Sequence, residues 1–302
     1  MSIHYWKNLG KEKTAIIAFE GGYHGDTFGS MSLGGRSNYT LPFWPYLFEV
    51  HSIPPPFKGE EEKSLEAIKR ISNAACFIFE PHVQAAAGMR IYSKEGLDVL
   101  LAECKKREIV TIADEVMTGF GRTGPLFVSS LFQNTPDIIA LSKGITGGTL
   151  PLGVTICQEK IHAPFVSKER SHTFLHGHSY TGNPISCAAA LASLDLTLDI
   201  SCDLNRKRIA HAHICFCEKW QGHPMLKRLE SIGTILVLEI VGETNYDNPI
   251  REKLLTFFIA HGILLRPIGN VLYVLPPYCI TDAELKTIYQ TIEEGLNHDF
   301  RL

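Results

Sequence analysis

Hydrophobic residues fall into short β-branched runs that alternate with segments of helical periodicity. This alternation predicts an α/β domain with a mainly parallel sheet, because a helix between two strands lets both run in the same direction. Strands are expected at residues 14–19, 76–79, 109–113, 137–141 and 152–157, and helices at 61–71 and 94–107. An Ala-rich helix is expected after Asn183, which suits its cap, and Pro184 suits its first turn.

The pattern changes near residue 200. Beyond it, helices are expected at residues 203–220, 249–261 and 282–297, a strand at 234–240, and a pair of strands within 263–274. Such a mixture is typical of an α+β domain. We therefore predict a large α/β domain at residues 1–200 and a smaller α+β C-terminal domain at residues 201–302.

The composition is that of an ordinary globular protein, since 45% of the 302 residues are hydrophobic and 20% are charged. A net charge of −3 gives no basic field that would favour a nucleic acid as a partner. The sequence has no run of roughly 20 apolar residues, the length that spans a membrane, and no apolar signal segment at its first residues. We therefore expect a cytoplasmic protein with neither a membrane nor a nucleic acid as partner.

Eight cysteines are scattered through a chain too long for a disulfide scaffold, so we expect reduced thiols. Cys215 and Cys217 lie close to His211 and His213, a combination that can indicate a metal site. On the helix expected there, side chains two positions apart point in different directions, so the four cannot converge on one ion. We therefore expect no metal ion.

The segment IADEVMTGFGRTG, from Ile112 to Gly124, places Asp114 where an apolar strand ends and a glycine-rich loop begins. Ligands of parallel α/β sheets bind beyond the carboxyl ends of the strands. An aspartate at that point could bind a cation or a protonated ring nitrogen, or it could cap the next turn. This segment alone leaves both interpretations open.

A second segment, LSKGITGG, places Lys143 directly after another predicted strand and before three glycines. A lysine beside an apolar strand end loses its proton more readily, as an amine nucleophile requires, and the glycines let the backbone approach a flat ligand. The glycines follow the lysine, so this is not the phosphate-binding loop of nucleoside triphosphatases. For the lysine alone, a solvated surface position is the ordinary alternative.

Asp114 and Lys143 gain meaning as a pair, because both follow strands and the chain between them has room for one helix. An acid for the pyridinium nitrogen and a lysine for covalent attachment are what pyridoxal phosphate requires of a protein. The protonated ring is an electron sink for the carbanion of an amine substrate, and the freed Lys143 amine can move the proton between carbon positions. The two segments therefore predict a pyridoxal phosphate enzyme.

These segments resemble those of the class III, fold-type I aminotransferases. Three further stretches narrow the resemblance to a branch that serves biotin synthesis: GYHGDTFGSMS at 22–32, HGHSYTGNP at 176–184, and LRPIG…LY…PPY at 265–278. That resemblance implies the type I fold of pyridoxal phosphate transferases. It also implies transfer of an amino group from S-adenosylmethionine to 8-amino-7-oxononanoate, giving 7,8-diaminononanoate. Another class III ω-aminotransferase, acting on ornithine, 4-aminobutyrate or a similar amine, is the alternative enzyme.

The resemblance implies roles for single residues at the cofactor ring. Lys143 would hold the cofactor covalently, and Asp114 would bond its pyridine nitrogen. Val116 would pack on one face of the ring, whereas Tyr23 would lie on the other face and touch the substrate. A plainer interpretation of Tyr23 is that it only forms part of a turn.

Other implied roles lie later in the chain. Ser179 and the backbone of His178 would reach the cofactor phosphate of the partner subunit, which implies a homodimer with a shared site. Gly177 would line the substrate pocket, and Arg266 would receive a substrate carboxylate in a two-pronged contact. The plainer interpretations are that Ser179 is a polar loop residue and Arg266 a surface charge.

Members of this family carry a substantial segment ahead of the part that matches Met1–Trp6, which itself looks like the tail of a helix. That segment includes a Gly/Ser turn at a helix N-terminus, which supplies phosphate-binding N–H groups, and aromatic residues that close the substrate pocket. From the sequence alone we therefore expect a large domain incomplete at its N-terminus, with exposed apolar surface and weakened cofactor binding. An inactive or partner-dependent remnant is the third functional hypothesis.

Overall fold

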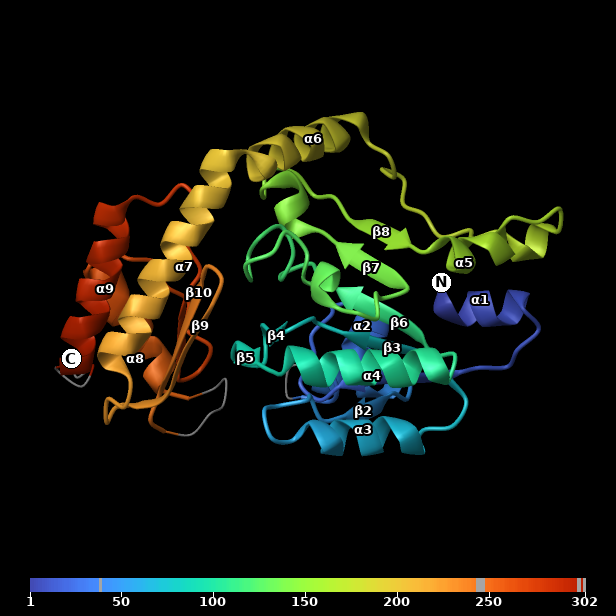
Figure 1. Ribbon diagram of the computed structural model, residues 1–302, viewed down its shortest axis with the longest axis horizontal. Helices are drawn as coiled ribbons and strands as arrows, with labels where there is room; N and C mark the ends of the chain where they lie inside the picture. Colours follow the sequence, from blue (N-terminus) through green and yellow to red (C-terminus); the bar gives the residue numbers. More distant parts are fainter. Residues whose placement is uncertain (38–39, 243–247, 298–299, 301–302) are drawn as a thin grey trace. The chain divides into compact units, whose positions relative to one another are not determined.

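The computed structural model describes residues 1–37, 40–242, 248–297 and 300 (Figure 1). The chain divides into two compact units. Met1–Phe120 and Phe127–Leu194 form the first, and Gly121–Leu126 and Asp195–Leu302 form the second. The glycine-rich loop after Asp114 therefore enters the second unit briefly before the chain returns to the first. The division at residue 200 stays a prediction, and it does not include this loop.

A six-stranded sheet forms the centre of the first unit (Figure 1). Its strands are β1 (Ala15–Phe19), β2 (His51–Ile53), β3 (Ala74–Phe79), β6 (Val110–Asp114), β7 (Ile138–Leu141) and β8 (Val154–Cys157). They lie in the order β2-β1-β3-β6-β7-β8, and every neighbouring pair is parallel except β7 and β8. The mainly parallel sheet is confirmed, and only the short strand β2 adds to the predicted set.

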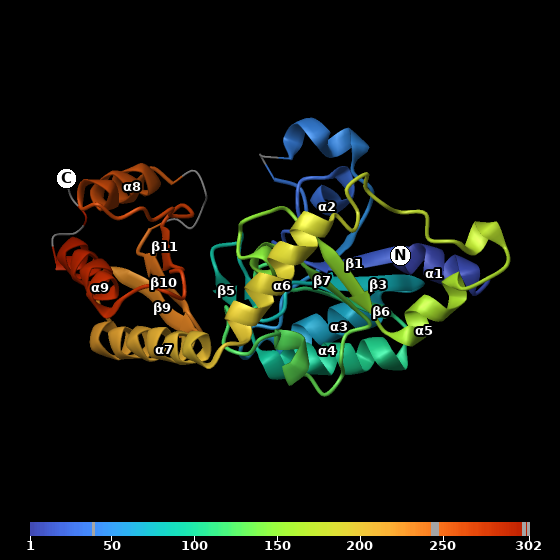
Figure 2. The same cartoon turned by 90° about the horizontal axis from the view of Figure 1, so that it is seen from above.

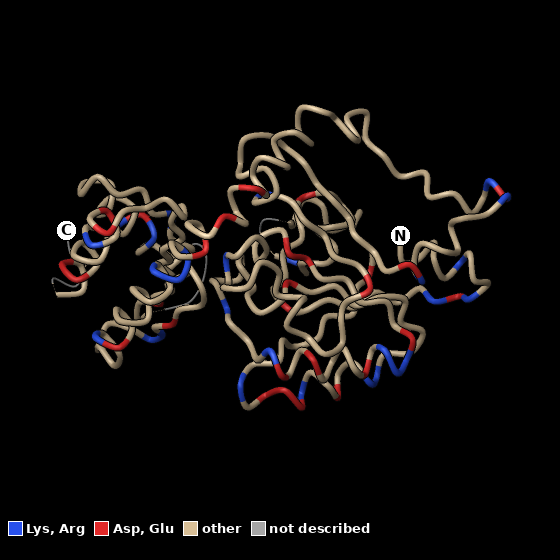
Figure 3. The backbone as a smooth tube through the Cα atoms, turned by 45° about the horizontal axis from the view of Figure 1, so that its top comes forward, with Lys and Arg blue, Asp and Glu red and all other residues tan. Residues whose placement is uncertain are grey.

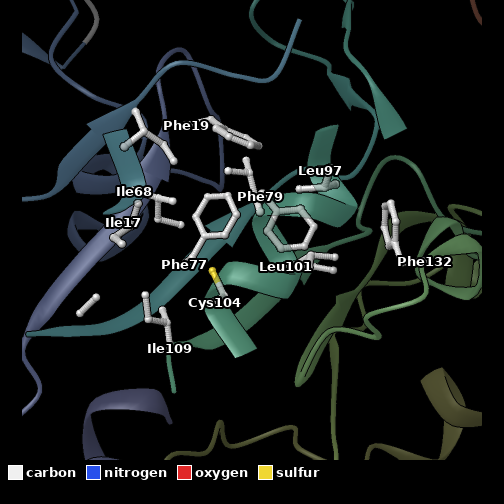
Figure 4. Packing of buried hydrophobic residues seen from close by; sticks show 14 of the residues in the cluster. Ile17, Phe19, Ile68, Phe77, Phe79, Leu97, Leu101, Cys104, Ile109 and Phe132 are labelled. Carbon is white, nitrogen blue, oxygen red and sulfur yellow. The ribbon is translucent and has the colours of Figure 1, made fainter. Parts of the chain in front are cut away.

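Helices cover both faces of this sheet. On one face lie α3 (Glu61–Arg70) and α4 (Lys94–Lys106), and on the other α1 (Ser2–Asn8) and α5 (Glu159–His162). Figure 4 shows Phe77 and Phe79 of β3 in one buried cluster with Leu97 of α4. Cys76 belongs to the opposite cluster, with Trp6 of α1, because successive residues of a strand point to opposite faces.

Short elements and one long helix complete the first unit. They are α2 (Phe28–Leu33), the hairpin β4 (Val83–Gln84) and β5 (Arg90–Ile91), the 3-10 helices η1 (Leu41–Tyr46), η2 (Val128–Leu131), η3 (Lys143–Thr146), η4 (Ala163–Phe165) and η5 (Arg170–His172), and α6 (Pro184–Leu198), which continues into the second unit at Asp195. Asn183 Oδ1 accepts the N–H of Ile185 at 2.9 Å and that of Ser186 at 3.3 Å. The predicted cap of α6 is therefore confirmed.

The second unit is an antiparallel sheet packed with helices (Figure 2). Its elements are α7 (Ile200–Trp220), β9 (Leu226–Ile232), β10 (Ile235–Ile240), α8 (Ile250–Ala260), β11 (Val271–Val274) and α9 (Asp282–Asn297). The strands lie in the order β11-β10-β9, and both pairs are antiparallel. Leu236 and Leu238 of the central strand share a buried cluster with Phe258 of α8 and Ile292 of α9.

Two features of the second unit differ from the sequence prediction. Within residues 263–274 only β11 forms a strand, and Ile268 contributes an isolated bridge to Val271. Pro267 has no N–H to give to a sheet, and Gly269 has a positive φ of 58°, so the first strand of the expected pair is wrong. The pattern also does not predict β9, because charged residues such as Arg228 interrupt its apolar alternation.

Candidate active site

The carboxyl ends of β3, β6 and β7 lie side by side, because these strands are parallel neighbours. Asp114, the last residue of β6, pairs with Ala140 of β7, shortly before Lys143. Glu80 directly follows β3, so the register brings Glu80, Asp114 and Lys143 to one edge of the sheet. We call it the carboxyl edge, and it is where parallel α/β sheets bind ligands.

Asp114 is held from two sides. Its Oδ2 lies 2.7 Å from Nδ1 of His24, and its Oδ1 accepts the N–H of Val116 at 3.1 Å. The side chains of His24 and Asp114 are 3% and 11% exposed. One carboxylate oxygen therefore caps the turn, as the plainer interpretation has it, whereas the other carboxylate oxygen contacts an imidazole that sequence reasoning missed.

His24 reaches Asp114 from the loop that follows β1. An ionised carboxylate only accepts hydrogen bonds, so Nδ1 of His24 is the donor in this contact. Nε2 is buried and has no hydrogen-bond partner among the residues that the structure describes. A Cβ at Gly22 would lie 3.3 Å from Nε2, so this glycine leaves the imidazole its room.

Glu80 is a second buried acid at the carboxyl edge, and it is only 6% exposed. Its Oε1 accepts the N–H of Tyr23 and its Oε2 that of Ala85, both at 3.0 Å. Burial raises the pKa of Glu80 to about 7, and the hydrogen bonds from Ala85 and Tyr23 oppose this rise. Sequence reasoning did not single out Glu80, although it directly follows the strand predicted at residues 76–79 and the argument for Asp114 applies to it too.

Lys143 is the first residue of η3 and has a positive φ of 43°. A non-glycine residue in this region is strained, and such strain is concentrated at functional sites. Neighbouring side chains hold the turn, since Ser142 Oγ donates to the carbonyl of Leu152 at 2.7 Å and Thr146 Oγ to that of Leu150 at 2.6 Å. The Lys143 side chain is exposed and makes no hydrogen bond or ion pair within the described ranges.

Gly144 lets two segments of the site approach closely. A Cβ at this position would lie 2.8 Å from the ring of Phe120, which belongs to the loop after Asp114. Phe120 itself has a positive φ of 58°. Ser193 Oγ of α6 donates to the Gly144 carbonyl at 3.1 Å, so η3 is fixed from the helix side as well.

Tyr23 presents its ring at the same edge and is 43% exposed. Its hydroxyl donates to Oδ2 of Asp26 at 3.1 Å. Partial burial, followed by this hydrogen bond, raises the pKa of Tyr23, so its hydroxyl is a hydrogen-bond donor at neutral pH. Val116, half-buried, lies in the turn after Asp114.

The remaining predicted site residues are not part of this edge. Gly177, His178 and Ser179 are exposed in the loop before α6, and the His178 N–H donates to Thr181 Oγ at 2.9 Å. Arg266 is exposed and belongs to the second unit. Their assigned roles stay predictions.

A cavity of about 380 Å³ lies elsewhere in the first unit. Its lining includes Val110 and Thr111, at the amino end of β6, together with Trp6, Asp137 and Lys160. This is the end of β6 opposite to Asp114, so the cavity is separate from the carboxyl edge. Because catalytic groups follow the strands and do not precede them, we place the site at the carboxyl edge.

Comparison with known proteins decides the family. The family profile described as aminotransferase class-III matches residues 1–296. The chain belongs to the class III aminotransferases. The adenosylmethionine-8-amino-7-oxononanoate aminotransferase of Synechococcus elongatus is 44% identical to it, over 98% of this chain and 72% of the relative. The enzyme of the same name from Geobacter sulfurreducens is 33% identical, over 98% of this chain and 71% of the relative.

Solved structures agree with this assignment. The crystal structure of adenosylmethionine-8-amino-7-oxononanoate aminotransferase from Methanocaldococcus jannaschii matches with a TM-score of 0.90 and 31% identity, over 97% of this chain and 71% of that one. An amine transaminase from an uncultivated Pseudomonas species, in its PLP-bound form, matches with a TM-score of 0.87 and 26% identity, over 98% of this chain and 72% of that one. The type I fold of pyridoxal phosphate transferases is thereby confirmed.

This aminotransferase is a pyridoxal phosphate enzyme, and the carboxyl edge fits that cofactor. A flat ring with a protonated nitrogen needs a fixed anion, and Asp114 is an anion held by two partners. Covalent attachment needs a reachable amine, and Lys143 is exposed at the neighbouring strand end. Asp114 and Lys143, both predicted from the sequence, therefore lie at one edge of the sheet. Tyr23 is next to His24 in the chain, and the His24 imidazole contacts Asp114.

Proposed function

We propose that this aminotransferase moves the amino group of S-adenosylmethionine to 8-amino-7-oxononanoate and so forms 7,8-diaminononanoate for biotin synthesis. The observation that carries this proposal is the relative with that name, 44% identical over 98% of the chain. Relatives of the same name from distant organisms, such as Helicobacter pylori at 35% identity, support it. The structural match at a TM-score of 0.90 concerns an enzyme of the same name.

In this proposal each residue at the carboxyl edge has one task. When bound, the cofactor supplies an electron sink for the electron pair left by the substrate proton. Asp114 holds the pyridine nitrogen, and Lys143 Nζ takes the proton from one carbon and returns it to another. Val116 and Tyr23 confine the ring between them, and Tyr23 also contacts the substrate. His24 keeps Asp114 in place through the 2.7 Å contact.

Substrate and phosphate binding involve residues beyond this edge. We assign Arg266 to a substrate carboxylate, because a guanidinium binds a carboxylate through two parallel hydrogen bonds. Gly177 lines the substrate pocket. Ser179 and the backbone of His178 bind the cofactor phosphate of a second subunit, which makes a homodimer necessary. Since the His178 N–H donates to Thr181 in this chain, phosphate binding must replace that bond or use the Ser179 hydroxyl alone.

The surface around these loop residues supports a homodimer. Leu175 and Tyr180 are 75% and 70% exposed beside Ser179, and Ile185 and Leu191 on α6 are 70% and 65% exposed. Large apolar side chains in such numbers on one segment mark an interaction surface. A second copy of the chain would cover them and bring Ser179 to the partner's cofactor.

The cellular setting in this proposal is the cytoplasm, with small molecules as substrates. None of the eight cysteines forms a disulfide, which suits a reducing compartment. Acidic and basic residues are interspersed along the described part of the backbone (Figure 3), and a net charge of −3 gives no basic field that would favour a nucleic acid. Among the described residues, no single helix is long and apolar enough to cross a membrane, and only the bent pair α6 and α7 passes that test together.

A second candidate is an ω-aminotransferase for other amines. The match to the Pseudomonas amine transaminase at a TM-score of 0.87 favours it, although the identity is lower, at 26%. The amino donor separates the two. Turnover with S-adenosylmethionine supports the first proposal, whereas turnover with ornithine or 4-aminobutyrate alone reverses the order.

The site itself is tested by trapping. The purified protein is mixed with pyridoxal phosphate, reduced with borohydride and digested for mass spectrometry. We expect a phosphopyridoxyl group on Lys143 that is lost in Lys143→Ala, with Lys160→Ala as a matched surface control. A folded protein without an adduct on Lys143 would overturn the proposed site and favour the remnant hypothesis.

A further inference from the structure

Glu80 is a buried carboxyl group at the carboxyl edge. It forms no ion pair with any residue that the structure describes, yet only 6% of it is exposed. A carboxylate in such a place is costly unless hydrogen bonds stabilise it. The hydrogen bonds of Glu80 therefore identify the segments that it fixes in place.

Those hydrogen bonds join three segments of the site. Oε1 accepts the N–H of Tyr23, in the loop after β1, and Oε2 accepts the N–H of Ala85, after β4. The hydroxyl of Tyr92, after β5, donates to the Glu80 carbonyl. Tyr23 is followed directly by His24, whose imidazole reaches Asp114. Glu80 thus binds the backbone of the loop that carries two proposed site residues.

We propose that Glu80 is a positioning residue of this aminotransferase, which holds the Tyr23–His24 segment so that the tyrosine ring and the imidazole stay beside Asp114. The inference rests on the proposed roles of Tyr23 and Asp114. Glu80 touches neither substrate nor cofactor in this account, and it acts through the backbone N–H of Tyr23.

The charge of Glu80 makes this function depend on pH. The pKa of Glu80 is raised to about 7. Burial is the largest cause and the charge of Asp114 adds to it, whereas the N–H donors of Ala85 and Tyr23 and the charge of His24 oppose the rise. Burial, and then the charge of Glu80, hold the pKa of Tyr92 well above its usual value, so Tyr92 stays a neutral donor beside it. Ionised Glu80 offers one carboxylate oxygen to each of the two N–H groups. When Glu80 is protonated, one oxygen carries a hydrogen and is a weaker acceptor, so one of the two hydrogen bonds is weakened. The Tyr23–His24 segment is therefore held less firmly as the pH falls through about 7.

Glu115, which directly follows the neighbouring strand β6, offers a matched control. It is fully buried, and its two oxygens accept the N–H groups of Val128 and Ser129, both at 2.8 Å. Burial raises the pKa of Glu115 too. Its hydrogen bonds hold η2 and not the Tyr23 loop. Replacing it tests what the loss of a buried, doubly bonded carboxylate does in general.

The experiment uses the holoenzyme and the variants Glu80→Gln, Glu80→Asp and Glu115→Gln. For each we measure kcat and KM for the amino donor, the affinity for pyridoxal phosphate, the visible absorbance of the bound cofactor against pH, and the melting temperature. We expect Glu80→Gln to raise KM about tenfold, the scale of one hydrogen bond to a charged group, with a smaller change in kcat. In the unchanged protein we expect the absorbance of the bound cofactor to change around pH 7, where Glu80 titrates. Glu80→Gln should remove this change.

The other variants separate positioning from plain stabilisation. Glu80→Asp keeps the charge, so it should retain a pH-dependent absorbance change even where its shorter side chain lowers the melting temperature. Glu115→Gln should lower the melting temperature with the KM and pH profile of the unchanged protein. The inference fails if Glu80→Gln leaves KM and the pH profile unchanged, or if Glu115→Gln alters them equally. Failure of the proposed site would show differently, as a cofactor adduct that persists in Lys143→Ala.

Discussion

The imidazole of His24 is packed against the carboxylate of Asp114, with Nδ1 2.7 Å from Oδ2 and both side chains almost fully buried. His24 lies in the loop after β1 and Asp114 is the last residue of β6, so the sheet brings them together. A buried carboxylate with a fixed partner stays where a cationic ligand can meet it. This contact leads to a direct test of the proposed cofactor site.

His24→Ala is expected to weaken the binding of pyridoxal phosphate roughly tenfold, because Asp114 loses its side-chain partner and keeps only the Val116 N–H. Titration of the apo-protein with the cofactor, followed by visible absorbance, measures this. His162→Ala, an exposed histidine on α5, is the control and should bind normally. Equal affinities for both variants would mean that the contact does not support the site.

Gly144→Ala is expected to destabilise the first unit by about 1–3 kcal/mol, since overpacking of a filled space has that scale. The new Cβ would lie 2.8 Å from Phe120, and one of the two segments would have to move. Gly153→Ala is the control, because its Cβ would meet only the Leu141 carbonyl at 3.9 Å. Thermal unfolding measures both.

A second-site change sharpens the Gly144 prediction. Phe120→Leu makes room at the point of contact, so Gly144→Ala combined with Phe120→Leu should cost less than the sum of the two single changes. Strict additivity of the two would show that the close approach of Gly144 and Phe120 is not the cause of the loss.

Much of the fold could be predicted from the sequence, because its signals are local. The apolar strands with helices between them predict the parallel sheet, and a parallel sheet predicts that Asp114 and Lys143 share one edge. Asn183 with Pro184 predicts the start of α6. In each case a few neighbouring residues contain the whole argument.

The rest depends on contacts between distant segments. The hydrophobic periodicity of the sequence does not predict that the loop after β1 brings His24 to Asp114. Nor does it predict the hydrogen bond from the Tyr23 N–H to Glu80. β9 is hidden by charges that an edge strand can expose to solvent. The excursion of Gly121–Leu126 into the second unit likewise rests on tertiary contacts of Arg122 that sequence neighbours do not reveal.

Acid should destabilise the second unit through His213. This residue is buried, Nε2 lies 3.3 Å from the Thr234 carbonyl, and Nδ1 lies 2.6 Å from the Tyr289 hydroxyl. A carbonyl only accepts, so Nε2 carries the proton and Nδ1 accepts from Tyr289. Burial lowers the pKa of His213 to about 4 from 6.5.

The direction in which stability changes with pH follows from proton binding at His213. Between pH 6.5 and about 4 the unfolded chain binds a proton at His213 that the folded chain does not. The stability due to neutral His213 is therefore complete above pH 6.5 and is lost as the pH falls towards 4, by about 3 kcal/mol in all. Urea unfolding at several pH values measures it. In His213→Asn this part of the pH dependence should vanish, and an unchanged slope would contradict the assignment.

Arg122 is expected to be the main attachment of the loop Gly121–Leu126 within the second unit. Its Nη1 donates to Thr234 Oγ at 3.1 Å and to the Pro276 carbonyl at 2.8 Å, and its guanidinium lies 4.5 Å from the ring centre of Tyr278. Burial lowers its pKa, and the nearby Tyr278 opposes this. Arg122→Met keeps an apolar side chain of similar length but removes both donors.

We expect Arg122→Met to lower the free energy of unfolding by about 2–4 kcal/mol, because it removes two hydrogen bonds and leaves a buried carbonyl unpaired. Lys207→Met, which removes an exposed cation on α7, should change it by less than about 0.5 kcal/mol. The loop follows Asp114 in the chain, so loosening it should also weaken the binding of pyridoxal phosphate. If the affinity stays normal while stability falls, Arg122 serves the second unit alone, and the short excursion of the chain has no part in shaping the carboxyl edge.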